Sequence, residues 1–86
     1  MSYRTEFTSS ATRDFSKLTE DIRQRLMPKI DALAHDPRPM GVQKLQGREN
    51  RYRIRVGDYR IVYEIQDEIL VVLIVRVGHR REVYRR

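Results

Sequence analysis

Arginine is the residue type whose spacing in this chain most directly suggests chemistry. Arg53, Arg55 and Arg60 lie close together, in a segment where charged and apolar side chains alternate. The planar guanidinium group binds a phosphate through two parallel hydrogen bonds and stacks on nucleic-acid bases. The three side chains therefore predict a phosphate-binding site, with solvated surface charge as the alternative.

A second group of candidate residues lies near the end of the chain. His79, Arg80 and Tyr84 follow Gly78, which allows the chain to bend and bring them back over the arginines. Histidine carries protons near neutral pH, and a tyrosine can stack on a base or move a proton. Taken singly, an isolated histidine is more often structural, and a tyrosine at this position more often packs against its neighbours.

The charge of the chain points to an anionic partner. Lys and Arg number 18 against 12 Asp and Glu, which gives a formal net charge of +6 and a pI near 10.2. Residues 1–43 hold seven basic and six acidic side chains, whereas residues 44–86 hold eleven and six. Because the excess lies in the second half, we expect that half to bind the anionic partner.

Length and composition exclude several classes of protein. A chain of 86 residues with 40% hydrophobic residues predicts one domain over residues 1–86. The absence of cysteine excludes disulfides, thiolate metal sites and a cysteine nucleophile, and the two histidines are too far apart for a zinc site. The longest apolar run, residues 69–75, is much shorter than a membrane helix, and residues 1–4 lack the apolar core of a signal peptide. We therefore expect no cofactor, no membrane contact and a cytoplasmic location.

Helical spacing predicts a pair of helices in the first half of the chain. Residues 8–10 are N-cap types and precede apolar positions at helical spacing over residues 11–18. Thr19 caps a second helix, whose apolar stripe covers residues 22–33. Pro28 interrupts this stripe, so either the helix kinks there or a new helical turn begins at the proline.

Alternating residues predict strands around these helices. Residues 3–7 form a short strand, and residues 36–50 form a connecting loop after the helices. Residues 51–56 and 59–65 form two further strands, and residues 69–77 form a strand that is apolar on both faces and therefore central. The predicted fold is α+β: an N-terminal strand and a helical hairpin packed on a small, mostly antiparallel sheet.

The two residues Gly57-Asp58 form a hairpin turn, with glycine first as a type II′ turn prefers. A two-residue turn fixes the pairing of the strands on both sides of it. The expected pairs are Val56 with Tyr59, Ile54 with Ile61 and Tyr52 with Tyr63 toward the core, and Arg55 with Arg60, Arg53 with Val62 and Arg51 with Glu64, an ion pair, away from it.

This register places Arg55 directly opposite Arg60. Like charges opposite each other destabilise a sheet by up to about 1 kcal/mol, unless an anion lies between them. We expect Arg53, Arg55 and Arg60 on one exposed face, so that Arg60→Ala would not lower stability. The face that Arg76 joins depends on whether the turn at residues 66–68 uses two or three residues.

Three blocks of sequence occur in a fixed order: Lys44-Leu45-x-Gly47, then Tyr52-Arg53-Ile54-Arg55-Val56-Gly57-Asp58-Tyr59-Arg60-Ile61-Val62-Tyr63, then Val77-Gly78-His79-Arg80-Arg81-Glu82-Val83-Tyr84. Together they resemble the RelE toxins of the RelE/ParE superfamily, over nearly the whole chain. The resemblance implies the toxin of a type II toxin–antitoxin pair. It would act as a metal-independent endoribonuclease that cuts mRNA in the ribosomal A site.

The resemblance also implies roles for individual residues. The neighbouring ribose 2′-hydroxyl attacks the scissile phosphate, while Arg53 and Arg55 position the RNA backbone or assist proton removal. Arg60 matches the arginine that stabilises the pentacoordinate phosphate. Arg80 matches the arginine near the leaving 5′-oxygen, and Tyr84 matches the tyrosine that stacks on the nucleotide.

Other residues carry less defined roles in the resemblance. Lys44, His79 and Arg81 are expected RNA contacts, and His79 is either a general acid or a phosphate contact only. Some relatives carry lysine where this chain has Arg53 and Arg55. Because a guanidinium accepts a proton less readily than an amine, the identity of the general base stays open.

The resemblance implies partners as well. We expect a cognate acidic, RelB-like antitoxin, the ribosomal A site with its mRNA and rRNA, and a toxin–antitoxin heterotetramer on operator DNA. Two alternatives remain: a ParE-like inhibitor that binds DNA gyrase without nuclease activity, and an RNA-binding module without activity. Arg60, Arg80 and Tyr84 occurring together favour the nuclease, because a binding module has no need for that combination.

Overall fold

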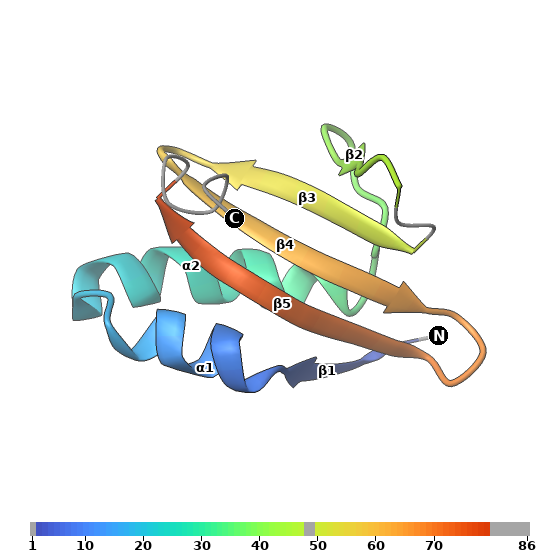
Figure 1. Cartoon of the computed structure of the whole chain (residues 1–86), viewed down its shortest axis with the longest axis horizontal. Helices are drawn as coiled ribbons and strands as arrows, with labels where there is room; N and C mark the ends of the chain where they lie inside the picture. Colours follow the sequence, from blue (N-terminus) through green and yellow to red (C-terminus); the bar gives the residue numbers. More distant parts are fainter. Residues whose placement is uncertain (1, 48–49, 80–86) are drawn as a thin grey trace.

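Strands and helices form close to where the sequence predicts them. The computed structural model describes residues 2–47 and 50–79. The elements are β1 (Arg4–Phe7), α1 (Ser9–Ser16), α2 (Glu20–Leu33), β2 (Gln43–Lys44), β3 (Arg51–Val56), β4 (Tyr59–Gln66) and β5 (Val71–His79). The strands form one five-stranded sheet in the order β1-β5-β4-β3-β2, antiparallel except for the parallel pair β1 and β5 (Figure 1). The expected α+β fold is confirmed.

Threonine caps start both helices. The side chain of Thr8 accepts a hydrogen bond from the N–H of Ala11 (3.0 Å), and that of Thr19 accepts one from Ile22 (3.4 Å). These bonds satisfy backbone donors that have no partner within the first helical turn. Both predicted caps are therefore confirmed.

Proline does not end the second helix. α2 runs through Pro28 as one helix, so no new helix begins there. Pro28 removes one backbone hydrogen bond, but Leu26 and Ile30 on either side are completely buried and hold the helix against the sheet. α1 ends at Ser16, which leaves Leu18 in the connection between the helices, where it still packs on the core.

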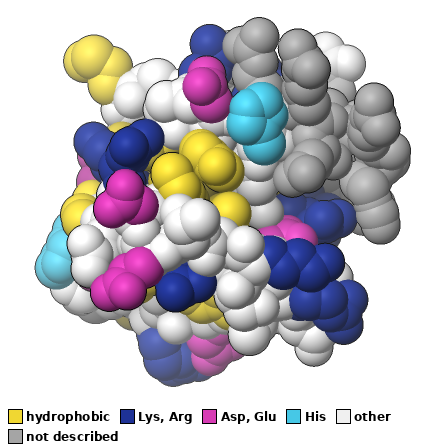
Figure 2. Space-filling view, turned by 90° about the vertical axis from the view of Figure 1, so that its left-hand side faces the viewer, with side chains coloured by type: hydrophobic (Ala, Val, Ile, Leu, Met, Phe, Trp, Pro, Cys, Tyr) yellow, Lys and Arg dark blue, Asp and Glu magenta, His cyan; other side chains and the backbone are white. Residues whose placement is uncertain are grey.

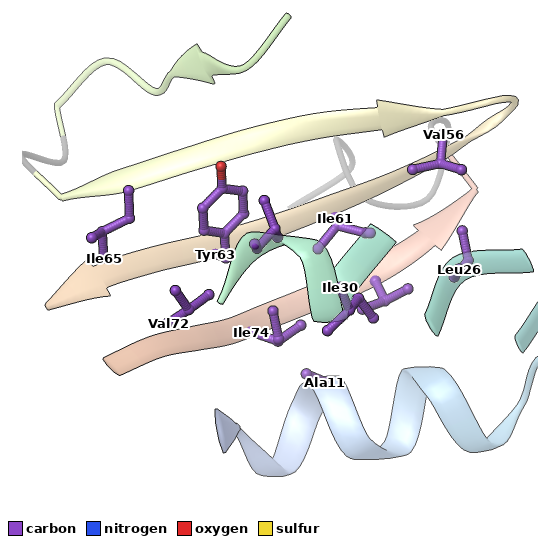
Figure 3. Close-up of a cluster of buried hydrophobic side chains, with 11 residues drawn as sticks. Ala11, Leu26, Ile30, Val56, Ile61, Tyr63, Ile65, Val72 and Ile74 are labelled. Atoms are coloured by element: carbon purple, nitrogen blue, oxygen red, sulfur yellow. The ribbon is translucent and has the colours of Figure 1, made fainter. Parts of the chain in front are cut away.

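The core lies between the two helices and one face of the sheet (Figure 3). α1 contributes Ala11, and α2 contributes three fully buried aliphatic side chains. The sheet contributes Val56, Ile61, Tyr63, Ile65, Val72, Ile74 and Val77. Alternate residues of β4 therefore supply the core, as the predicted register requires, whereas the step from Ile74 to Val77 in β5 spans an irregularity in the pairing.

The β3–β4 hairpin has the predicted register at each of its six pairs, from Val56 with Tyr59 to Arg51 with Glu64. Gly57 has φ +60°, while Asp58 is not among the described residues with positive φ, as a type II′ turn requires. Arg51 Nη2 lies 2.8 Å from Glu64 Oε2, so the expected cross-strand ion pair is confirmed.

Two expected boundaries are wrong. The turn after β4 takes four residues, 67–70, because Gln66 pairs with Val71, and Leu70 closes the turn with φ +55°. β5 therefore begins at Val71 rather than at residue 69. The segment 36–50 is not only a loop, because β2 lies within it and pairs with β3. Among the described residues, no helix is long and apolar enough to cross a membrane.

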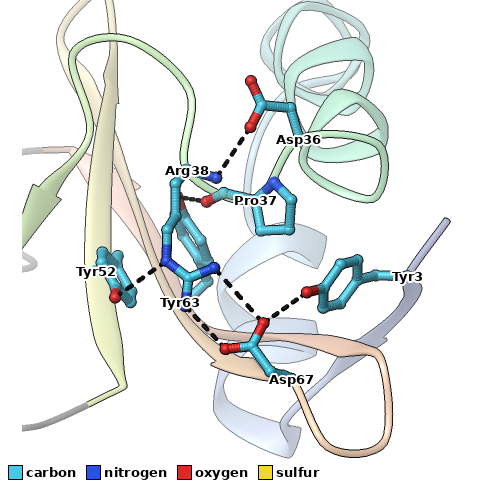
Figure 4. Close-up of polar contacts among 7 residues, drawn as sticks. All are labelled: Tyr3, Asp36, Pro37, Arg38, Tyr52, Tyr63 and Asp67. Atoms are coloured by element: carbon cyan, nitrogen blue, oxygen red, sulfur yellow. Dashed lines mark hydrogen bonds and ion pairs between the residues drawn. The ribbon is translucent and has the colours of Figure 1, made fainter. Parts of the chain in front are cut away.

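A cluster of polar contacts fixes the chain after α2 (Figure 4). The guanidinium of Arg38 donates to Asp67 (2.9 Å) and to the hydroxyl of Tyr52 (3.3 Å), and Tyr3 donates to the same Asp67 carboxylate (2.5 Å). The hydrogen bonds from Arg38 and Tyr3 lower the pKa of Asp67, and the bond to Asp67 raises the pKa of Tyr3. These contacts join the loop, β3, the β4–β5 turn and the N-terminal segment.

The carboxylate of Asp14 contacts the part of β5 that lies beyond the end of β1. β1 ends opposite Ile74, and the chain continues as α1 beside β5. Asp14 Oδ2 accepts hydrogen bonds from Arg76 Nε (2.7 Å) and from the backbone N–H of Val77 (3.0 Å). Partial burial acts to raise the pKa of Asp14, but the hydrogen bonds from Arg76 and Val77 outweigh it and lower the pKa.

We expect Asp14→Ala to reduce the free energy of unfolding at neutral pH by about 1.5–3 kcal/mol, because it removes hydrogen bonds to a charged group. A carboxyl group whose pKa is lower in the folded protein than in the unfolded chain stabilises the fold at pH values above the pKa of the unfolded chain. This stabilisation is lost as the pH falls through the pKa of the folded protein. The difference in the free energy of unfolding between wild type and Asp14→Ala should therefore shrink between pH 7 and pH 3. Urea unfolding at both pH values measures it, and an unchanged difference would contradict the ion pair.

Candidate functional site

Two rows of paired residues carry the candidate site on the face of the sheet opposite the core. One row consists of Arg55, Arg60 and Gly78, and the other begins with Arg53 and Val62. The register therefore brings together Arg53, Arg55 and Arg60, as the sequence predicts. Gly78 lies directly opposite Arg60 in the β4–β5 ladder and contributes no side chain to this row.

The three arginines differ in exposure, which corrects the expectation of one exposed face. Arg55 is exposed and Arg53 is half-buried, but Arg60 retains only 6% of its accessible surface. Among the described residues, Arg60 is the one charged residue that is buried. With so little accessible surface, the Arg60 side chain is restricted by its neighbours rather than moving in solvent. Preorganised charge of this kind is what transition-state stabilisation requires.

Arg76 lies on the same face of the sheet as these arginines. An irregularity in the pairing of β4 with β5 places it there, and not the length of the turn between these strands. Val62 of β4 pairs with Arg76 of β5, but the next residue, Tyr63, pairs with Ile74. Val75 is therefore an extra residue in β5 at this point of the ladder. This irregularity places Arg76 in the row of Arg53 and Val62. Its ion pair with Asp14 of α1 directs Arg76 toward the helix, so we do not include it in the candidate site.

Gln43 is a site residue that the sequence analysis missed. It pairs with Arg53 in the β2–β3 ladder, and its side-chain oxygen accepts a hydrogen bond from the Arg53 guanidinium. Lys44, the predicted RNA contact, is exposed but pairs with Tyr52, so it lies in the row of the opposite face. The register therefore brings Gln43, and not Lys44, beside the arginines.

His79 is not brought onto the arginine face. His79 pairs with Tyr59, and their ring centroids lie 5.7 Å apart in an edge-to-face contact. Tyr59 and Val56 belong to the core-facing row. His79, which pairs with Tyr59, therefore lies on the core-facing side of the sheet and not on the side of Arg60. Arg80, Arg81 and Tyr84 lie outside the described residues.

Positive and negative side chains are mixed at one end of the molecule. Figure 2 shows one end of the molecule, where Lys and Arg side chains lie among Asp and Glu side chains around a group of hydrophobic ones. Within residues 2–47 and 50–79, no three His, Asp or Glu side chains come together as a potential metal site. The candidate chemistry of the described face is therefore that of fixed positive charge and hydrogen-bond donors.

Comparison with known proteins places this fold in a class. Residues 5–84 match the family described as ParE toxin of type II toxin–antitoxin system, parDE. Toxin RelG of Mycobacterium tuberculosis is 34% identical over the whole length of both chains. The mRNA interferase toxin RelE of Escherichia coli is 34% identical, over 98% of this chain and 92% of its own.

Solved structures of toxin–antitoxin complexes have the same fold. The intact E. coli RelBE complex matches with a TM-score of 0.80 at 32% identity, over 90% of this chain and 95% of the matched one. An archaeal RelE–RelB complex from Pyrococcus horikoshii matches with a TM-score of 0.79 at 28% identity, over 93% and 97%. The fold and these matches define a small toxin of the type II toxin–antitoxin class. Within that class, the chain belongs to the RelE/ParE family as a RelE-type toxin.

Proposed function

We propose that this toxin is a ribosome-dependent endoribonuclease that cuts mRNA in the ribosomal A site and thereby stops translation. The observation that carries the proposal is the cluster of Arg53, Arg55 and the buried Arg60 on one face of the sheet. The name of the E. coli relative, an mRNA interferase toxin, supports the same activity. RelE-type relatives over the full length of the chain also favour this activity over gyrase inhibition.

In the proposed reaction, the ribose 2′-oxygen forms a bond to the neighbouring phosphorus as the bond from phosphorus to the 5′-oxygen breaks. The 2′-hydroxyl loses its proton to a general base, and the leaving 5′-oxygen gains one, which yields a 2′,3′-cyclic phosphate and a 5′-hydroxyl. Arg60 stabilises the charge on the pentacoordinate phosphate, and Arg53 and Arg55 hold the RNA backbone. The resemblance adds Arg80 at the leaving oxygen and Tyr84 against the base, and it implies no metal.

A RelB-like antitoxin is the proposed protein partner. The structures of relatives that match this chain include complexes named for RelB and RelE. The net charge of +6 fits an acidic partner, which would oppose RNA binding by covering the basic face. The ribosome with its mRNA and rRNA, and operator DNA bound by a toxin–antitoxin heterotetramer, complete the proposed set of partners.

Mapping the 5′ ends of mRNA after brief induction tests the proposal. We expect new ends inside translated reading frames, which disappear when initiation is blocked and when the product of a neighbouring antitoxin gene is coexpressed. A strain that expresses Arg60→Met serves as the control for effects of expression alone. Gyrase-dependent DNA breaks with intact mRNA would instead support the ParE-like alternative.

A further inference from the structure

A recess beside the arginine face has a lining suited to RNA. Its volume is about 450 Å³, and it lies where Lys29 of α2, Gln43 of β2 and Arg53 and Arg55 of β3 meet. This volume is within the range of small-ligand pockets, roughly 300–1,000 Å³. The loop before β2 forms part of the wall through the fully exposed Met40.

The charge of this recess differs from that of two other recesses in the described structure. Its lining holds three basic side chains and, among the described residues, no Asp or Glu. A recess at the β4–β5 turn is lined by Asp67 and Glu68, and one between the helices is lined by Glu20 and Asp31. The recess at β3 is therefore the one of these three that favours an anion.

The backbone of β3 adds hydrogen-bonding groups to the recess. A two-residue turn closes on a hydrogen-bonded pair, so the backbone groups of Val56 and Ile54 form hydrogen bonds with β4. The N–H and C=O of Arg55, between them, point away from β4, toward the opposite edge of β3. The same alternation explains why the carbonyl of Arg51 accepts a bond from Leu45 (2.8 Å). β2 pairs with β3 at Tyr52 and Arg53, so Arg55 lies beyond the end of β2, where no described strand pairs with that edge of β3.

We propose that this recess binds the nucleotide next to the scissile phosphate, with Lys29 contacting its phosphate. The inference rests on the proposed function. Arg53 and Arg55 belong both to the arginine face and to the lining of the recess, so an RNA strand held by them continues into it. Gln43 keeps Arg53 at the border between the two through its hydrogen bond. Basic side chains combined with backbone groups at a strand edge are typical of single-stranded RNA recognition.

Binding to programmed ribosomes tests this site without requiring cleavage. The probe is mRNA with a 2′-O-methyl group at the scissile nucleotide, which removes the attacking hydroxyl. We expect Lys29→Ala to weaken binding about fivefold and to lower the salt dependence by about 0.7 in the slope of log K against log salt, as for one lost phosphate contact. The matched control is Lys17→Ala, because Lys17 is also an exposed lysine and does not line the recess.

Neutral phosphates locate the contact along the RNA. A methylphosphonate next to the scissile phosphate should weaken binding of wild type and of Lys17→Ala, and should have no further effect on Lys29→Ala. Equal binding of Lys29→Ala and wild type would overturn the inference, and so would a loss confined to antitoxin binding. Cleavage of unmodified mRNA is measured in parallel. If the wild-type protein binds programmed ribosomes but does not cut mRNA, the proposed function is contradicted. The binding test of the recess then still gives its own answer.

Discussion

Arg60→Met should reduce cleavage of mRNA on programmed ribosomes by at least about a hundredfold, because one preorganised charge on a transition state is typically worth about 3–4 kcal/mol. Arg60 is suited to this role because it is 6% exposed and fixed in the row between Arg55 and Gly78. Methionine keeps an unbranched apolar stem in the same space and removes only the charged end. We therefore expect the variant to stay folded, with a melting temperature close to that of wild type.

Two further variants separate the charge of Arg60 from its packing. The burial of Arg60 reverses the expectation drawn from an exposed face: Arg60→Ala should melt at a lower temperature, because it empties a buried position. Arg51→Met is the control, because Arg51 lies on the neighbouring strand β3 and forms an ion pair with Glu64. Single-turnover cleavage rates and thermal melts of Arg60→Met, Arg60→Ala and Arg51→Met separate the effect of the charge from the effect of packing. Cleavage by Arg60→Met at a rate near that of wild type would remove Arg60 from the site.

The position of the arginines could be predicted because it depends on local sequence. A two-residue turn at Gly57 fixes the pairing of Arg55 with Arg60, whatever the rest of the chain does. The exposure of Arg60 could not be predicted in the same way, because exposure depends on which distant segments pack over the strand. The same limit applies to Arg76, whose place follows from the irregularity at Val75 and from Asp14 on α1.

The short strand β2 shows why one site residue was missed. A strand of two residues is too short to show alternation, so Gln43 and Lys44 look like part of a loop. The available signal is the pair of glycines on either side. Gly41 and Gly47 have φ of +90° and +78°, which are turn conformations that bracket an extended segment. The resemblance predicts Lys44 as the RNA contact, whereas the register places its neighbour Gln43 beside Arg53.

Tyr63 connects the core to the loop that forms one wall of the recess. Its side chain is completely buried, its ring stacks on Tyr52 with centroids 6.0 Å apart, and its hydroxyl donates to the carbonyl of Pro37 (2.6 Å). Burial raises the pKa of Tyr63, so the phenol stays protonated and keeps this hydrogen bond. The bond holds the start of the segment that continues to Met40 and β2.

Tyr63→Ala is expected to lower the free energy of unfolding by about 3–5 kcal/mol, because it removes a buried ring and leaves a cavity. Tyr63→Phe keeps the ring and should cost about 1–2 kcal/mol, since the carbonyl of Pro37 loses its donor. In a domain of this size each kcal/mol corresponds to roughly 4–8 °C in melting temperature. Chemical denaturation of both variants measures the two contributions separately.

The effect of Tyr63→Phe should be concentrated in the loop. The N–H of Val42 donates to the carbonyl of Pro39 (3.1 Å), so hydrogen exchange at Val42 reports on the segment that Tyr63 anchors. We expect exchange at Val42 to accelerate more than exchange in β4 and β5, because the hydrogen bonds of those strands open only with the sheet. Tyr52→Phe is the matched control: it makes the same change on the neighbouring strand, where the hydroxyl contacts the exposed Arg38. Equal acceleration in both variants would show that the bond from Tyr63 to Pro37 holds the loop no more firmly than the bond from Arg38 to Tyr52 does.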